Sequence, residues 1–465
     1  RDLVRSRGLG DVYKRQVMLL LTGLLFIPIR GGFTVSTMNT GKVYFSSNQR
    51  LNHAAINPAF SLMESLSKQK DFGKQYRFME AAQADELIKN LVDPSVLDST
   101  AMVPDTLRTT LFKTERPNVI FVILESFSSR LMTTLGGEPD VAVQMDSLAK
   151  EGILFTNFYA NSFRTDRGLV AILSGYPAQP TTSIMKYPRK TQNLPAIAGS
   201  LRDTGYRTKY YYGGDADFTN MRSYLMSSGF ENIISDQDFP VSERLSKWGA
   251  HDHLVFNRLL EDMKAEAADT ASAENARPFF QVLQTSSSHE PFEVPYRRLA
   301  NDRLNAFAYT DSCVGDFVKR FRELPQWKNT VLVLVPDHLG AYPEHLNNLS
   351  VDRYQIPLLL IGGAVSEPRR IDIYGSQHDI AATLLAQLSL PHQDFVFSKD
   401  MLNPASPHFA FFAVPDAFGM VTPDNQLIFN CEANAVAVDE GSTKGKNLLP
   451  GKAYLQKLYD DIAKR

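Results

Sequence analysis

Two apolar stretches of the chain end in side chains of the kinds that bind metal ions. Glu125 directly follows the run 118–124, and Asp337 and His338 directly follow the run 331–336. Two carboxylates and an imidazole suit a divalent cation, with Mn²⁺ favoured and Mg²⁺ or Zn²⁺ as alternatives. A divalent ion neutralises charge on phosphoryl oxygens and activates a hydroxyl, so this residue set points to phosphoryl transfer.

Thr165 supplies a hydroxyl that could serve as the nucleophile and as a further metal ligand. A threonine hydroxyl attacks poorly at neutral pH unless it is deprotonated or metal-bound. Arg164 and Arg167 flank it, and arginine binds phosphate oxygens bidentately. We expect Arg164, more than Arg167, to bind the substrate phosphate; the alternative is that both arginines face solvent. A helical stretch over 168–173 would place free N–H groups near Thr165, which favours an anion; the alternative is that Thr165 only caps this helix.

These side chains are expected to meet at one edge of a sheet. Apolar, β-branched runs are typical of strands buried on both faces of a parallel sheet, and ligands bind beyond the carboxyl ends of such strands. The alternation of strands and helices predicts an α/β fold, with a mixed, mostly parallel sheet sandwiched by helices. Besides the two runs above, the sequence predicts strands at 153–159, 207–212, 279–285 and 356–361, and helices at 141–151, 194–203, 220–228, 251–265, 303–322 and 379–388.

The order and strand context of these motifs resemble those of lipoteichoic acid synthase-like phosphoglycerol transferases, within the alkaline phosphatase and sulfatase superfamily. The resemblance covers roughly 117–401. It implies an alkaline phosphatase/sulfatase-like fold and a divalent metal, usually manganese, held by Glu125, Thr165, Asp337 and His338. It also implies that Thr165 is the nucleophile. Formylglycine sulfatases of the same superfamily need Cys or Ser followed by Pro and Arg at that position, and Thr165-Asp-Arg does not meet this requirement.

Two further site residues follow from the same resemblance. His289, in Ser286-Ser-Ser-His289, matches a family histidine that contacts the substrate phosphate or protonates the leaving oxygen; the alternative is a loop histidine bonded to backbone. Arg222 corresponds to a phosphate-binding arginine in a Phe-Trp-Asn-Arg element. Here Thr219 replaces the tryptophan, the arginine is shifted by one position, and the histidine that the synthases carry near Gly213 is absent.

The resemblance implies a membrane-anchored enzyme that attacks a phospholipid such as phosphatidylglycerol and releases diacylglycerol. A phosphoglycerol group on Thr165 would then pass to a glycan or glycerol hydroxyl. A metal-dependent phosphodiesterase or phosphatase, with water as the acceptor, is the alternative at the same site. A catalytically silent, membrane-tethered binding domain is a third hypothesis, and the complete Glu-Thr-Asp-His set argues against it.

Composition adds bounds. The chain has 465 residues, a net charge of −2 and no long basic block, so nothing indicates nucleic acid as a partner. Two cysteines, Cys313 and Cys431, cannot form a disulfide framework or a thiolate zinc site.

The segments outside the catalytic core have separate predictions. Residues 1–16 are expected to be a non-native scar, and the apolar segment 17–33 the end of a truncated transmembrane helix. A buried core helix is the alternative for the second segment. Residues 34–115 are expected to form an arm that links the membrane to a catalytic domain at 116–402, and 403–465 to add closing strands (409–414, 426–431) and a helix (453–464). The catalytic domain would face the periplasm or exterior of a bacterial cell.

Overall fold

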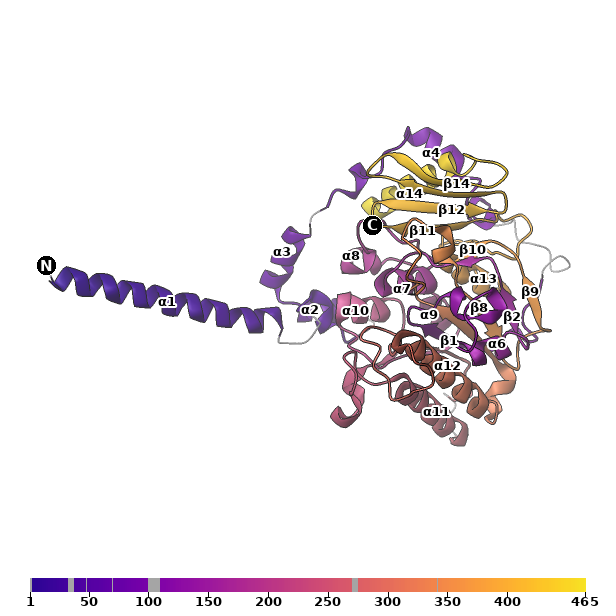
Figure 1. Cartoon of the computed structure of the whole chain (residues 1–465), viewed down its shortest axis with the longest axis horizontal. Coiled ribbons are helices and arrows are strands. Elements are labelled where there is room, and N and C mark those ends of the chain that lie inside the picture. The colour runs from indigo at the N-terminus through magenta and orange to yellow at the C-terminus, as the bar shows by residue number, and fades with distance from the viewer. Residues whose placement is uncertain are drawn as a thin grey trace.

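The computed structural model describes residues 2–31, 37–46, 48–68, 70–98, 109–269, 275–340 and 342–465. A long amino-terminal helix leaves an α/β body, and a small β region covers one end of that body (Figure 1). Within the described residues, one helix, α1 (Asp2–Arg30), contains a stretch long and apolar enough to cross a membrane, Val12–Ile29. The helix therefore begins well before the predicted segment 17–33, the end of which lies outside the described residues.

The central sheet of the described chain has eight strands and confirms the predicted mixed, mostly parallel architecture. Strand β8 runs antiparallel to both of its neighbours, β7 and β2, and the other pairs are parallel. The order across the sheet is β5 (Asn232–Ile234), β4 (Arg207–Tyr212), β6 (Phe279–Gln284), β1 (Asn118–Leu124), β7 (Thr330–Pro336), β8 (Leu358–Ile361), β2 (Ile153–Phe155) and β9 (Arg369–Ile371).

Both faces of the sheet are buried, because successive side chains of a strand point to opposite faces. In β1, Val119, Phe121 and Ile123 belong to one apolar cluster, and Ile120, Val122 and Leu124 belong to the other. Helices cover each face (Figure 1). The first cluster includes side chains of α7 (Thr165–Ser174), α9 (Ile197–Asp203), α10 (Met221–Ser227) and α13 (Ile380–Gln387), and the second includes those of α6 (Val143–Leu148), α11 (Asp252–Ala268) and α12 (Asp302–Phe321).

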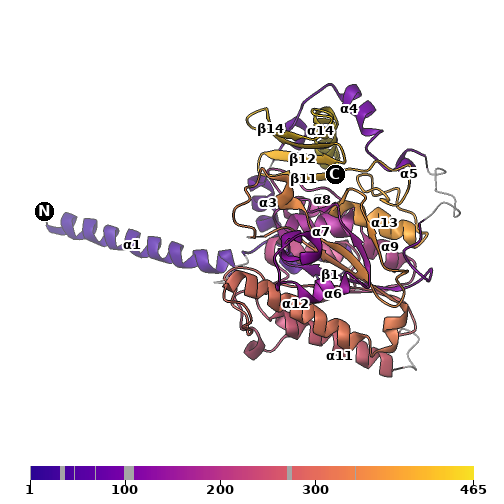
Figure 2. The ribbon, with the colours of Figure 1, turned by 45° about the vertical axis from the view of Figure 1, so that its right-hand side comes forward.

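A second, antiparallel sheet confirms the predicted carboxyl-terminal β region. Its strands follow one another in chain order and pack with the last helix (Figure 2). They are β11 (Ala410–Val414), β12 (Ala417–Thr422), β13 (Asn425–Asn430) and β14 (Ala435–Glu440), and the helix is α14 (Leu448–Lys464).

The sequence misplaced or missed several short elements. The strand expected at 153–159 is two strands, β2 and β3 (Phe158–Tyr159), and β3 pairs with β10 (Gly375–Ser376) in a separate sheet. Strands β5, β9, β12 and β14 were not predicted. Their apolar patterns are short or interrupted: two exposed arginines precede the one buried residue of β9, and β14 is largely exposed.

The arm between α1 and the sheet packs along the body. It contains α2 (Gln49–Ala55), α3 (Pro58–Ser67), α4 (Ala81–Ile88) and α5 (Pro94–Leu97), and α4 lies against α14. Backbone N–H groups of Phe78 and Met79 donate to Gln456 Oε1 at 2.8 and 3.1 Å. The arm is thus held by polar contacts as well as by apolar packing. Residues 99–108 of the predicted arm lie outside the described residues.

Candidate metal and nucleophile site

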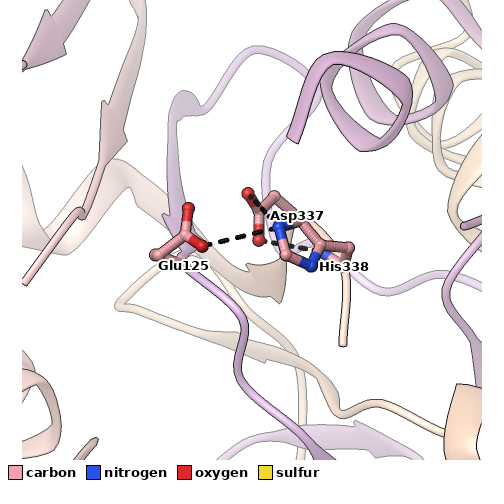
Figure 3. Close-up of side chains that lie close together, drawn as sticks. All are labelled: Glu125, Asp337 and His338. Carbon is pink, nitrogen blue, oxygen red and sulfur yellow. Dashed lines mark hydrogen bonds and ion pairs between the residues drawn. The ribbon is translucent and has the colours of Figure 1, made fainter. Parts of the chain in front are cut away.

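The strand register brings the three metal-ligand side chains together. β1 and β7 are parallel neighbours with Leu124 opposite Pro336, so Glu125 and Asp337 leave the sheet side by side. The Asp337 N–H donates to Leu124 O at 3.1 Å, which continues the ladder past the end of both strands. Glu125, Asp337 and His338 are buried, and each offers a ligand atom within 4.8 Å of the others (Figure 3).

The amino-terminal turn of α7 carries the Thr165 hydroxyl to the same point. Thr165 Oγ1 lies 3.4 Å from Glu125 Oε2 and 3.3 Å from His338 Nε2. Gly168 permits this approach, because a Cβ at that position would lie 1.7 Å from the carbonyl oxygen of Asp337. The helix can therefore rest directly on the strand end that carries Asp337. Thr165 is the first residue of α7, so its helix begins three residues earlier than the sequence predicts.

The hydrogen bonds around Asp337 and His338 leave ligand atoms directed at the centre of the group. Asp337 Oδ1 accepts from the backbone N–H groups of Ser126 and His338 at 2.9 and 2.7 Å. Asp337 Oδ2 is buried and receives no hydrogen bond. His338 Nδ1 lies 2.6 Å from Leu339 O, an acceptor, so this nitrogen carries a proton and Nε2 is the ring atom directed at the two carboxylates. A carboxylate oxygen without a donor and an imidazole nitrogen that points at it, beside Glu125, fit a divalent cation.

Two buried carboxylates, Glu125 and Asp337, lie beside one imidazole, that of His338, so the negative charge exceeds the positive charge available. Burial and the neighbouring Glu125 carboxylate raise the pKa of Asp337 to about 7. Burial alone would lower the pKa of His338, but the Asp337 and Glu125 carboxylates raise it to about 9. Burial disfavours the charged form of Glu125, yet the facing His338 lowers the pKa of Glu125 to about 2. A cation placed among these groups would replace the shared proton.

Glu125 is fixed by residues that motif matching did not single out. Its N–H donates to Thr285 Oγ1 at 2.9 Å, and its carbonyl oxygen accepts from Ser288 Oγ at 2.7 Å. Ser126 adopts a left-handed backbone (φ 58°) and donates to Glu125 Oε1 at 2.6 Å. A non-glycine residue in this conformation is held there by its surroundings. The run of small hydroxyl residues after the Phe279–Gln284 strand was the only sequence signal for Thr285 and Ser288.

His289 is a partly exposed residue of the loop that follows β6. Its ring packs on Trp248, with the ring centroids 4.2 Å apart, and its Nδ1 lies 3.2 Å from Glu290 O. Trp248 Nε1 donates to that same carbonyl oxygen at 2.7 Å, so one backbone group orients both rings. The Nε2 atom of His289 is the ring nitrogen left for a substrate oxygen. His289 is close enough to Glu125 to be one of the groups that lower the pKa of that carboxyl.

Asp252 organises the loop that carries His289. It is the first residue of α11 and is fully buried, and its Oδ1 accepts from the N–H groups of Ser286 and Ser287 at 2.8 and 3.0 Å. Its other oxygen accepts from Thr310 Oγ1 at 2.7 Å. This tertiary role goes beyond the helix-capping one that an aspartate at a helix start usually has.

The three arginines considered as phosphate ligands differ in whether other protein groups already bind their guanidinium groups. Arg164 is exposed and forms no ion pair with any described residue; its guanidinium lies 5.7 Å from the Phe163 ring centroid. Arg167 donates to Thr182 O at 2.9 Å. Arg222 Nε donates to Asp217 Oδ1 at 2.7 Å, so a carboxylate holds the guanidinium that was predicted to bind phosphate.

Comparison with known proteins places this site in a family. Residues 117–390 match the sulfatase family model. Phosphoglycerol transferase I of Xanthomonas campestris pv. campestris (strain B100) is 26% identical over 326 residues, which are 65% of this chain and 45% of that protein. The lipoteichoic acid synthase-like protein YvgJ of Bacillus subtilis (strain 168) is 22% identical over 62% of this chain and 50% of its own length. The chain thus spans about half the length of these curated relatives.

Solved structures show the same fold. A protein of the alkaline phosphatase superfamily from Vibrio parahaemolyticus superposes with a TM-score of 0.70 at 24% identity, over 84% of this chain and 97% of that one. The lipoteichoic acid synthase LtaP of Listeria monocytogenes superposes with a TM-score of 0.64 at 19% identity, over 80% and 98% of the two chains. These structural matches confirm the fold, and the family model and the curated relatives confirm the resemblance drawn from the motifs.

Proposed function

The chain belongs to the sulfatase family, and within it we propose a membrane-anchored, metal-dependent phosphotransferase with Thr165 as its nucleophile. The enzyme would move a phosphoglycerol group from a phospholipid, phosphatidylglycerol, to a hydroxyl of a glycan or of glycerol. The observation that carries the proposal is the position of the Thr165 hydroxyl, 3.4 Å from Glu125 and 3.3 Å from His338 at the start of α7. The names of the curated relatives support phosphoglycerol as the transferred group.

Glu125, Asp337, His338 and Thr165 would hold one divalent ion, with Mn²⁺ favoured over Mg²⁺ and Zn²⁺. When bound, such an ion lowers the pKa of a hydroxyl and neutralises charge on phosphoryl oxygens. The chain's own residues do the rest. Gly168 lets α7 pack Thr165 against the strand ends, and the free N–H groups of the first helical turn would favour a bound phosphate.

Transfer would take place in two displacements. In the first, Thr165 Oγ1 gives up its proton to the adjacent Glu125 carboxylate and forms a bond to phosphorus, while the bond from phosphorus to the diacylglycerol oxygen breaks. His289 Nε2 protonates that departing oxygen. In the second, the acceptor hydroxyl loses its proton to His289 and forms a bond to phosphorus, while the bond from phosphorus to Thr165 Oγ1 breaks and that oxygen takes its proton back from Glu125. Arg164, which is exposed and unpaired among the described residues, would bind the non-reacting phosphate oxygens.

Anchoring and orientation are part of the same proposal. Val12–Ile29 would cross the membrane by its length and composition. A lipid donor requires the active site to lie at a bilayer surface, and we place the body on the periplasmic or exterior side.

A hydrolase that uses water as the acceptor remains the second candidate, and a specific observation favours it. Arg222, predicted to bind the glycerophosphate group, is held by Asp217 at 2.7 Å. A site with its arginine occupied would bind a smaller or less charged group at that position. Incubation of the full chain with labelled phosphatidylglycerol, with and without candidate acceptors, separates the two functions. Mass spectrometry should find the label on the acceptor; glycerol phosphate as the sole labelled product, whatever acceptor is added, would establish hydrolysis instead.

A further inference from the structure

A groove of about 690 Å³ lies between the arm and the segment that follows the active-site helix. The arm contributes side chains of α3 and its flanks, among them Leu62 and Lys68. The body contributes Lys186, Tyr187 and Arg189. None of these residues has a part in the metal site or in the proposed transfer.

The groove is basic on one side. Lys70, Lys186 and Arg189 are exposed, and none of the three forms an ion pair with a carboxylate among the described residues. Lys68 at the same rim is paired with Glu64 at 2.6 Å and also donates to Lys186 O at 3.2 Å. An uncompensated cluster of this kind, which we call the groove cations (Lys70, Lys186 and Arg189), attracts anionic phosphate groups.

The outer face of α3 is apolar and uncovered. Leu62, Met63 and Leu66 are 61%, 72% and 59% exposed. At about 100° per residue these three side chains share one face of the helix. Leu51 of α2 and Phe45 before it are also exposed, at 49% and 64%. Apolar side chains gathered on one face beside free cations form the pattern of a helix that lies in a membrane interface.

The position of α3 relative to α1 fits that reading. Two views 45° apart both show α3 on the side of the body from which α1 departs (Figures 1 and 2). The stretch of α1 apolar enough to span a bilayer, Val12–Ile29, is entirely unburied by the rest of the chain. With α1 in a membrane, α3 and the groove cations would lie close to the surface of that membrane.

We propose that α3 and the groove cations dock on an anionic phospholipid bilayer, with Leu62, Met63 and Leu66 inserted among the acyl chains and lipid phosphates seated in the groove. This inference rests on the membrane location in the proposed function but not on the reaction. The residues that directly precede the groove segment Lys186–Lys190 contact the active-site helix α7. Thr182 O accepts from Arg167 Nε at 2.9 Å, and Ser183 Oγ donates to Asp166 O at 3.3 Å, next to Thr165. Docking would therefore fix the height of the first turn of α7 above the lipid surface.

An environment-sensitive fluorophore tests the docking directly. The full chain carrying Cys431→Ser and Leu62→Cys, labelled with a nitrobenzoxadiazole dye, is reconstituted through α1 into nanodiscs. Cys313 is buried and should not react. The discs contain phosphatidylcholine alone or mixed with phosphatidylserine, a lipid that is anionic but carries no glycerol head group. The matched control is Lys150→Cys, an exposed position after α6 on the opposite side of the sheet from α7.

Docking predicts a blue-shifted, brighter dye at position 62 in the anionic discs and no change at position 150. High salt should reverse the shift, because surface attraction of this kind is screened. Lys186→Gln and Arg189→Gln should each lower the ratio of docked to undocked arm about fivefold. Thr165→Ala should dock as well as the parent chain, which separates failure of docking from failure of the reaction.

Two results would overturn the proposal. One is the same spectrum at position 62 in neutral and anionic discs, with no effect of Lys186→Gln or Arg189→Gln. The other is a blue shift that appears only when two chains share a disc, since a second copy of the protein would then cover α3.

Discussion

Asp337 Oδ2 faces Nε2 of His338 at 3.5 Å and, although buried, receives no hydrogen bond. The other oxygen of the same carboxylate accepts two backbone N–H groups, so the side chain is rigidly held with one oxygen unused. A buried carboxylate oxygen without a donor is costly unless a cation or a proton satisfies it.

Asp337→Asn should therefore abolish tight binding of the divalent ion while the chain stays folded. The amide keeps an oxygen for the two backbone donors but replaces the metal-facing oxygen with a donor group. Elemental analysis of the purified protein by mass spectrometry measures the metal. Asp311→Asn is the matched control, because Asp311 is also buried and also accepts two backbone N–H groups, those of Gln144 and Met145. Equal metal content in the two variants would remove Asp337 from the ligand set.

Thr165→Ala should eliminate turnover with little effect on folding. The Thr165 side chain caps no backbone group in α7, so the expected loss of unfolding free energy is below about 1 kcal/mol. Ser162 is the neighbouring hydroxyl, but it is buried and donates to Ala413 O at 2.8 Å. Ser162→Ala should stay active and lose about 1 kcal/mol of stability. Diacylglycerol release and thermal unfolding of the two variants check this; an inactive Ser162→Ala beside an active Thr165→Ala means that the nucleophile is misassigned.

Much of this candidate site could be predicted from the sequence, because both candidate carboxylate ligands directly follow a long buried run. The runs that form β1 and β7 are apolar throughout, and parallel pairing with equal ends forces Glu125 and Asp337 together. The partners that orient these groups could not be found in the same way. Trp248 contacts His289 because of the course of an irregular segment between α10 and α11, which has no sequence pattern. Asp217 pairs with Arg222 because a tight turn between them brings the two side chains together.

The arm shows the same division. Its polar composition predicts a linker, whereas in the structure Asp93 of the arm accepts a hydrogen bond from the Asp400 N–H at 2.7 Å. A single buried carboxylate in a polar segment gives no periodic signal, so this contact between the arm and the body cannot be predicted from the sequence pattern.

Trp248→Ala should slow the first displacement without changing metal content. The substitution removes the ring that packs on His289 and the hydrogen bond to Glu290 O. A misplaced proton donor lowers the rate by up to about 100-fold. Rapid-quench measurement of diacylglycerol release reports this step. Trp327→Phe, at the remote Phe321 contact, is the control; an equal loss of rate in both variants would point to general destabilisation rather than to His289.

The Asp93–His392 pair should make the packing of the arm on the catalytic body depend on pH. Burial opposes ionisation of Asp93, but His392 and the hydrogen-bond donors lower the pKa of Asp93 below 3.8. The stability that Asp93 contributes is therefore present above pH 3.8 and is lost as the pH falls through the lowered pKa. Burial likewise opposes the charge of His392, yet Asp93 raises its pKa above 6.5, so its contribution is complete below that value and is lost as pH rises through the folded-state pKa.

The pair therefore stabilises the fold most between pH 3.8 and 6.5. Asp93→Asn should cost about 1–3 kcal/mol in that window and less at alkaline pH. Denaturant unfolding of parent and variant at several pH values measures the difference, with Asp140→Asn, an exposed carboxylate in the loop before α6, as the control. If Asp93→Asn lowers the free energy of unfolding equally at every pH, His392 does not interact with this carboxylate.

The central claim is that the transferred group rests on Thr165. The full chain with its metal is mixed with phosphatidylglycerol labelled in the head group, without acceptor, and quenched at short times. The account predicts a burst of diacylglycerol and label on the peptide that contains Thr165, both absent from Thr165→Ala and both slower in His289→Ala. Diacylglycerol release only when an acceptor is present, with no label on the protein at any quench time, would contradict a covalent intermediate and remove Thr165 from the role of nucleophile.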